Sequence, residues 1–131
     1  MPYHIRNRPS QMAAESPDFA YAVTLLRNLF DAAVENAYPG SELVGFLPEP
    51  PRGKTIVVGA GKAGASMAQT LEKSLWSIDD SLIIVPQGHR LQTESLNIIE
   101  ASHPVPDRIG LDGALHILEM ARSLKSDDLL L

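Results

Sequence analysis

The sequence of 131 residues predicts an α/β fold, a Rossmann-like three-layer sandwich with a mainly parallel sheet of about four strands. Short runs of β-branched apolar residues alternate with segments in which apolar residues recur every three or four positions, as strands and helices alternate in βαβ units. The first run stops at a glycine-rich loop, residues 59–64, which leads directly into a helical pattern. Strand, glycine loop and helix in this order are typical of doubly wound sheets that bind ligands at the carboxyl ends of their strands.

Composition limits the class of protein. With 44% hydrophobic and 21% charged residues, the sequence has the composition of one ordinary globular domain. Its formal charge of -5 and its lack of a Lys and Arg cluster argue against a nucleic-acid surface. The absence of cysteine excludes a disulfide scaffold and a thiolate zinc site, and we expect a cytoplasmic protein. No apolar run approaches the ~20 residues that span a bilayer, so we expect neither a membrane span nor an export signal.

The start of the chain is polar and without a period, and we expect residues 1–16 to be a mobile leader. The predicted domain then covers residues 17–131. Ser16 as N-cap and Pro17 in the first turn predict a helix of about five turns that ends before Pro39. We expect its apolar stripe to pack on the sheet. The stripe consists of Phe19, Ala22, Val23, Leu26, Phe30, Ala33, Val34 and Ala37.

The middle of the chain alternates between strands and helices. Residues 41–47 fit either a short helix or a loop, and we then expect a strand at residues 54–58 and a helix from the glycine loop to about Ser77. Further buried strands are predicted at residues 81–85 and 97–101. The link between these two is short for a parallel crossover, which usually needs about a dozen residues, so the direction of the third strand is left open.

The last predicted helix begins at Asp107, whose carboxylate fits an N-cap. Gly110 and Gly113 are expected to weaken its first turn. Residues 128–131 have the pattern of a further buried strand that the end of the chain cuts off. The predicted apolar face of the helix consists of Leu111, Ala114, Leu115, Leu118, Ala121 and Leu124.

Right-handed crossovers bring three loops to one edge of such a sheet, residues 59–64, 87–90 and 102–107. This edge is the predicted cleft. The charged candidates on it are Lys62, His89, Arg90, His103 and Asp107. His89 and His103 have no acidic pair between them at ligand spacing, so we predict no metal site in this chain.

The glycine loop predicts an anion site. Gly59, Gly61 and Gly64 fit the pattern G-x-G-x-x-G, whose missing side chains let a phosphate approach the backbone. Lys62 adds a positive charge at the start of the following helix, where free N–H groups and the helix dipole already favour an anion. A dinucleotide-binding fold places an acid at the end of the second strand, and this chain has none there. We therefore favour the carboxylate or phosphate of a small substrate over a dinucleotide.

Two motifs at a defined separation resemble a known family. They are Gly59-Ala60-Gly61-Lys62-Ala63 after the first strand and His103-Pro104-Val105-Pro106-Asp107 after the third, with Gly88-His89 between them. This order is similar to the amino-terminal part of the glycerate kinases of the MOFRL type, many of which carry the name hydroxypyruvate reductase. The resemblance covers about residues 17–131.

The resemblance implies ATP-dependent phosphorylation of D-glycerate to a phosphoglycerate, with Mg²⁺, in a cleft between a Rossmann-like domain and a carboxyl-terminal domain. Lys62 matches the loop lysine of the family, which faces the substrate or the transferring phosphate, and is the expected catalytic residue. A lysine at a helix start suits phosphoryl transfer, because that reaction depends on positioning and on charge neutralisation. The expected substrate- or phosphate-binding residues are Gly59, Gly61, Gly64, His89, His103 and Asp107.

Length is the main departure from the family. There the strand at residues 128–131 leads into most of the enzyme, so we expect this chain to be an inactive fragment that lacks its carboxyl-terminal domain and binds neither ATP nor Mg²⁺ strongly. A strand edge exposed at that point would favour self-association. Two alternatives stay open: an NAD(P)H-dependent hydroxypyruvate reductase, and a non-enzymatic module that binds a sugar phosphate or a nucleotide.

Overall fold

The computed structural model describes residues 17–38 and 40–131. The chain forms two compact units, Met1–Tyr38 and Pro39–Leu131. Within the described ranges, no helix combines the length and the hydropathy needed to cross a membrane.

The first unit contains helix α1, Pro17–Ala37, which confirms the helix predicted from the apolar period. The expected leader, the Ser16 cap and the Pro39 stop lie outside the described residues. Large side chains of the apolar stripe are exposed, including Leu26 at 66% and Phe30 at 68%. The packing of this stripe on the sheet therefore stays a prediction.

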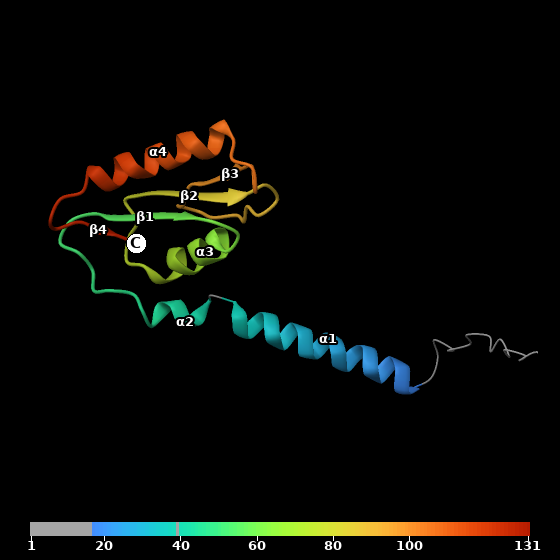
Figure 1. The fold of residues 1–131 in the computed structure, drawn as a ribbon. Helices are drawn as coiled ribbons and strands as arrows, with labels where there is room; N and C mark the ends of the chain where they lie inside the picture. The colour runs from blue at the N-terminus through green and yellow to red at the C-terminus, as the bar shows by residue number, and fades with distance from the viewer. Residues whose placement is uncertain (1–16, 39) are drawn as a thin grey trace, which may run out of the picture. The chain divides into compact units, whose positions relative to one another are not determined.

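The second unit is built on a four-stranded parallel sheet with the strand order β3-β2-β1-β4 (Figure 1). The strands are β1 (Thr55–Ala60), β2 (Asp80–Pro86), β3 (Ile98–Ala101) and β4 (Leu129–Leu130). This is the order of the first four strands in the doubly wound dinucleotide-binding sheet, so the predicted α/β class is confirmed. The third strand, whose direction the sequence left open, runs parallel to β2.

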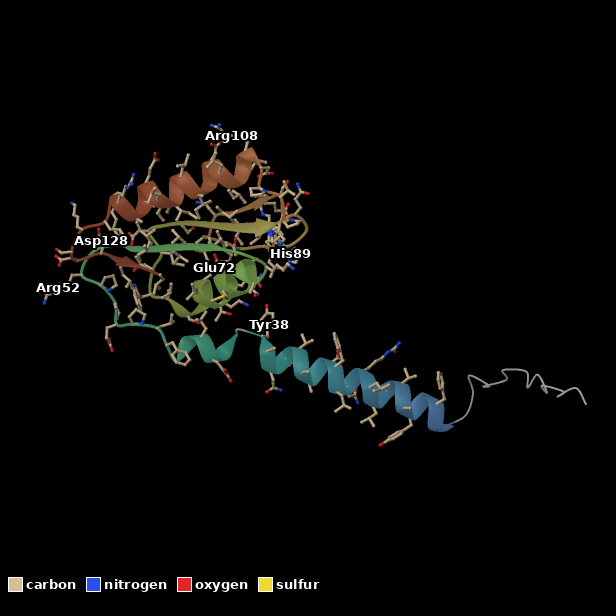
Figure 2. The ribbon with its side chains drawn as sticks, in the orientation of Figure 1. Tyr38, Arg52, Glu72, His89, Arg108 and Asp128 are labelled. Atoms are coloured by element: carbon tan, nitrogen blue, oxygen red, sulfur yellow. The ribbon has the colours of Figure 1, made fainter. Side chains whose placement is uncertain are left out.

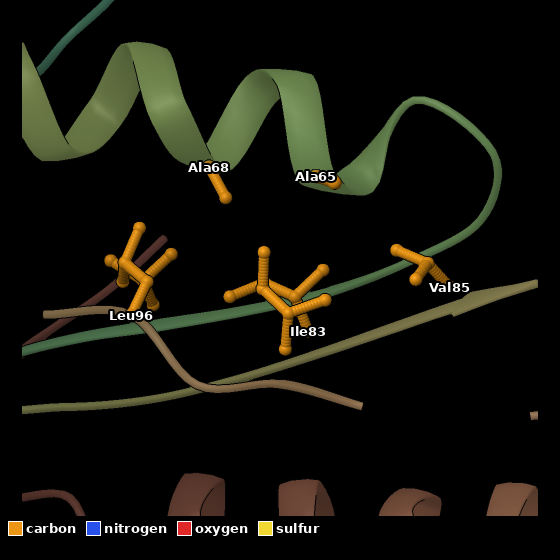
Figure 3. Close-up of a cluster of buried hydrophobic side chains, with 7 residues drawn as sticks. Ala65, Ala68, Ile83, Val85 and Leu96 are labelled. Carbon is orange, nitrogen blue, oxygen red and sulfur yellow. The ribbon is translucent and has the colours of Figure 1, made fainter. Parts of the chain in front are cut away.

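Helices cover both faces of this sheet, with α3 (Gly64–Ser74) on one face and α4 (Arg108–Arg122) on the other (Figure 1). Each helix lies over its own cluster of buried side chains, because neighbouring residues of a strand point to opposite faces. Under α3, Ala65 and Ala68 face Ile83, Val85 and Leu96 (Figure 3). Under α4 the buried cluster is Ile56, Leu82 and Met120.

The face of α4 that packs on the sheet differs from the predicted one, although Leu124 of the predicted residues does pack against the buried cluster. Gly113 and Met120 are its buried residues. The large leucines of the predicted face are exposed instead: Leu111, Leu115 and Leu118. A Cβ on Gly113 would lie 2.8 Å from Ile99 Cδ1 and 2.9 Å from Ile84 Cδ1. The prediction was wrong for the leucines because α4 approaches two isoleucines of the sheet through Gly113, and Ile117 packs on the same side.

The link between β2 and β3 has no helix of its own. Glu72 of α3, which is labelled in Figure 2, binds this link through hydrogen bonds. Glu72 Oε1 accepts hydrogen bonds from the backbone N–H groups of residues 94–96 and from the Ser95 hydroxyl (2.8 Å). Partial burial favours the neutral acid, but these donors outweigh it and lower the pKa of Glu72. In a crossover helix, such backbone N–H groups would bond to carbonyls of the helix itself. Here the Glu72 carboxylate accepts them instead, so the two parallel strands can be joined by a short connection without a helix.

Helix α3 is shorter than predicted and ends at Ser74 rather than near Ser77. Leu75 is extended, with φ -83° and ψ 151°. Trp76 Nε1 then donates to Oγ1 of Thr55, a fully buried residue of β1 (3.0 Å). The bond from Trp76 to Thr55 and the packing of Leu75 against the core stabilise the extended chain here, so the helix does not continue for another turn.

The amino ends of β1 and β4 are joined by Asp128. Its carboxylate accepts hydrogen bonds from the backbone N–H groups of Lys54 and Lys125, both 2.8 Å long, and these bonds lower its pKa. The strand predicted at residues 128–131 is confirmed as β4, Leu129–Leu130, which pairs in parallel with β1. For residues 41–47, which precede β1, the sequence allowed either a short helix or a loop. The structure has the short helix α2 (Ser41–Val44) there.

Candidate functional site

The glycine loop follows the carboxyl end of β1 and turns the chain into α3. Gly61 has φ 116°, a conformation that favours glycine, and its N–H donates to the carbonyl of Ile84 in β2 (2.9 Å). Gly64 permits close packing, because a Cβ there would lie 2.9 Å from Ile83 Cγ2. At Gly59 an added Cβ would make only ordinary contacts. Two of the three glycines thus have the roles in turn and packing that the pattern predicts.

The first turn of α3 presents positive charge to an anion. Its N-cap, Ala63, offers no side-chain acceptor, and the Ser66 hydroxyl donates back to the Ala63 carbonyl (2.9 Å). Lys62 is exposed, and it forms no ion pair within the part of the chain that the structure describes. The lysine charge, the helix dipole and the N–H groups of the first turn act in the same direction, although the Gly64 N–H already donates to the Gly61 carbonyl (3.1 Å). This arrangement can bind a carboxylate or a phosphate.

A hollow of about 510 Å³ lies beside the loop, between α2, α3 and the ends of β1 and β4. Loop backbone and Lys62 form one side of it. Its apolar walls include Leu43, Phe46, Leu47, Met67, Leu71 and Leu131. The strand order makes β1 and β4 neighbours at the point where the crossovers change face, which is where doubly wound sheets bind their ligands.

A second hollow of about 130 Å³ lies between the glycine loop and the segment after β3. Gly61, Pro86, Ser102 and His103 are among the residues that line it. The structure therefore brings His103 and the glycine loop together, as predicted.

The second predicted loop, residues 87–90, contributes less to these hollows. Arg90 lines a separate hollow with residues 91–93. His89 is exposed and lines none of these three hollows. A substrate contact by His89 stays a prediction.

Asp107 is the N-cap of α4, which confirms that prediction. Its Oδ1 accepts from the Gly110 N–H (2.8 Å) and its Oδ2 accepts from the Ser102 N–H (3.1 Å). The Gly110 bond, with help from Ser102, holds the pKa of Asp107 below its ordinary value. Both oxygens therefore already pair with backbone, and a substrate contact by Asp107 stays a prediction.

Glu100 was not among the predicted site residues. It lies in β3, and its Oε1 accepts a hydrogen bond from the Gly88 N–H in the turn after β2 (2.7 Å). Glu100 is a charged residue within a predicted strand that is otherwise mostly apolar, and this position could have indicated that its carboxylate has a specific partner.

Fold and site define an α/β domain with a glycine loop and an exposed lysine at the carboxyl edge of its sheet. Residues 25–131 match a protein family described as a domain of unknown function, DUF4147. The chain belongs to this family.

Relatives carry two different enzyme names. A protein of Agrobacterium vitis with the name "Putative hydroxypyruvate reductase" is 44% identical over 106 residues, which are 80% of this chain and 24% of that protein. A "Glycerate 2-kinase" of Pyrococcus horikoshii is 30% identical over 78 residues, 60% of this chain and 18% of that protein.

The fold is also that of a solved structure. The crystal structure of glycerate kinase from Thermotoga maritima superposes with a TM-score of 0.70 over 85% of this chain and 27% of its own, at 23% identity. This likeness shows the fold alone. The chain spans about a quarter or less of the length of the curated relatives that it matches.

Proposed function

We propose that this chain contributes the glycine-loop wall of the active site of an ATP-dependent D-glycerate kinase, which makes a phosphoglycerate. The observation that carries the proposal is the exposed Lys62 at the uncapped start of α3, beside a hollow of about 510 Å³. The glycerate kinase name of the Pyrococcus relative supports the same reaction. We further propose that the 131 residues alone do not turn over substrate.

The chemistry of phosphoryl transfer suits this site. A hydroxyl oxygen of glycerate would bond to the terminal phosphorus of ATP and lose its proton to solvent while the bond to ADP breaks, and negative charge spreads over the equatorial phosphate oxygens. Lys62 would neutralise part of this charge or hold the glycerate carboxylate. The first N–H groups of α3 would orient the same anion.

The described residues alone do not supply a full set of ligands for Mg²⁺. Among residues 17–38 and 40–131, no three His, Asp or Glu side chains gather as a metal centre requires. Mg²⁺ commonly keeps several waters and binds through substrate phosphates with one or two carboxylates. We propose that it reaches this site with ATP rather than through a cage made by this chain.

A nicotinamide-dependent hydroxypyruvate reductase is the second candidate. The strand order and the pattern of Gly59, Gly61 and Gly64 favour it, as does the name of the Agrobacterium relative. Against it, β2 ends at Pro86 with no acid to bind the ribose hydroxyls of the cofactor. Glu100 of the neighbouring strand β3 already accepts a hydrogen bond from Gly88.

Paired assays separate the two reactions. The complete gene product and the 131-residue chain are each given D-glycerate with Mg-ATP, and ADP release is followed together with phosphorus NMR of the product. Each is also given hydroxypyruvate with NADH or NADPH. We expect phosphoglycerate from the complete product and no turnover by the chain alone. Oxidation of NADH without ADP release would establish the reductase, and ligand binding without any turnover would favour a non-enzymatic module.

A further inference from the structure

The turn after β2 has a defined geometry that presents His89. The His89 N–H donates to the Pro86 carbonyl (3.0 Å), which closes a four-residue turn. Gly88, its third residue, has φ 78°, and no described residue other than glycine has a positive φ. These features define a type II turn, which requires glycine or a similarly permissive residue at that position.

We propose that Glu100 is a positioning residue, which holds this turn and thereby places His89 at the carboxyl edge of the sheet. The role of His89 rests on the proposed function, because it is expected to bind the substrate or its phosphate. Glu100 would act through Gly88 and would not touch the substrate itself.

The register of the sheet puts Glu100 in reach of the turn. Glu100 pairs with Val85, one residue before Pro86, across the neighbouring strands β2 and β3. Side chains alternate along a strand, so Glu100 shares a face with Ile98, which belongs to the cluster under α3. From there its Oε1 accepts the Gly88 N–H at 2.7 Å.

This bond selects one orientation of the turn. In a type II turn the closing bond uses the carbonyl of the first residue and the N–H of the fourth, so the N–H of Gly88 has no partner within the turn. Hydrogen bonds to an ionised acceptor are the strong ones. Glu100 therefore stabilises the peptide orientation on which the position of His89 depends.

Amide hydrogen exchange on the 131-residue chain tests the contact directly. In Glu100→Ala the Gly88 amide should exchange about tenfold faster, because a bond to a charged group is lost. Glu100→Gln keeps a carbonyl acceptor and should stay near the wild-type rate. Glu94→Ala removes an exposed carboxylate from the same connection and is the matched control. Should Glu100→Ala fail to fold, Glu100→Thr gives the same comparison with a shorter side chain that suits a strand.

Kinetics of the complete gene product test the consequence. Glu100→Ala should raise KM for D-glycerate by about tenfold to a hundredfold, the scale of a small misplacement, and Glu100→Gln should restore it. An unchanged Gly88 exchange rate in Glu100→Ala, or equal acceleration in Glu94→Ala, would overturn the proposed contact. Faster exchange with an unchanged KM would overturn the positioning role. If the wild type phosphorylates no glycerate, the proposed function fails, whereas the exchange rates still decide whether Glu100 holds the turn.

Discussion

Replacing Gly113 with alanine tests which face of α4 packs on the sheet. The added Cβ would lie 2.8 Å from Ile99 Cδ1 and 2.9 Å from Ile84 Cδ1, closer than such atoms normally approach. We expect this overpacking to cost about 2 kcal/mol, within the usual range for an extra methyl group in a packed core. Alanine's better helix propensity offsets about 1 kcal/mol of that cost. The net loss of stability should be about 1 kcal/mol.

Shortening both isoleucines should remove the penalty. Ile84→Val and Ile99→Val each delete the Cδ1 methyl, at a cost of about 1 kcal/mol apiece. Of the three nearest atoms, this background keeps the Cγ1 atom of residue 84, which would lie 3.3 Å from the added Cβ. Gly113→Ala should then change stability by between about 0 and 1 kcal/mol in the stabilising direction, because helix propensity dominates.

Urea unfolding of the wild type, Gly113→Ala, the double valine variant and the triple variant measures this coupling, with the slope m compared throughout. Leu115→Gln on the exposed face of α4 is the control and should shift stability by less than about 0.5 kcal/mol. Equal destabilisation by Gly113→Ala in both backgrounds would refute the packing described for α4. A large loss in Leu115→Gln would refute it too.

Two further predictions concern the carboxylates that hold backbone groups. Asp107→Ala should lower the thermal midpoint more than Asp107→Asn, because asparagine can cap α4 and alanine cannot; equal losses would argue against the cap. Stability should also fall as the pH drops below about 4, where carboxyl groups begin to protonate. The folded-state pKa values of Glu72, Asp107 and Asp128 are lowered, so their contribution is complete above the ordinary pKa and is lost as the pH falls through the folded pKa. Urea midpoints of Glu72→Gln should accordingly decline less steeply with acid than those of the wild type, and identical slopes would contradict this role.

The parts of the fold that the sequence predicted correctly are those in which the spacing of apolar residues and the positions of glycines indicate the same helix or strand boundaries. The strands β1 and β2, the glycine loop and the N-cap Asp107 were each visible in the sequence, within one or two residues of their observed bounds. The direction of β3 was not, since it depends on Glu72 binding the backbone of residues 94–96 from another element. The packing face of α4 was missed because a glycine contributes no hydrophobic side chain to the pattern.

The candidate site was predictable only in part. Lys62 and His103 were chosen from motifs, and the structure places both beside hollows that the glycine loop lines. The bond from Gly88 to Glu100 depends on side-chain reach from β3 to the turn after β2, which sequence spacing does not encode. Nor does the sequence indicate that Arg90 lines a separate hollow.

The turnover of two lysine variants decides whether the loop charge acts in catalysis. In the complete gene product, Lys62→Met should lower kcat for D-glycerate with Mg-ATP by about 10² to 10³, the cost of losing one group that stabilises transition-state charge. Lys73→Met, in the last turn of the same helix, should keep the wild-type kcat. A Lys62→Met protein with wild-type kcat and KM would contradict the proposed role of the glycine loop.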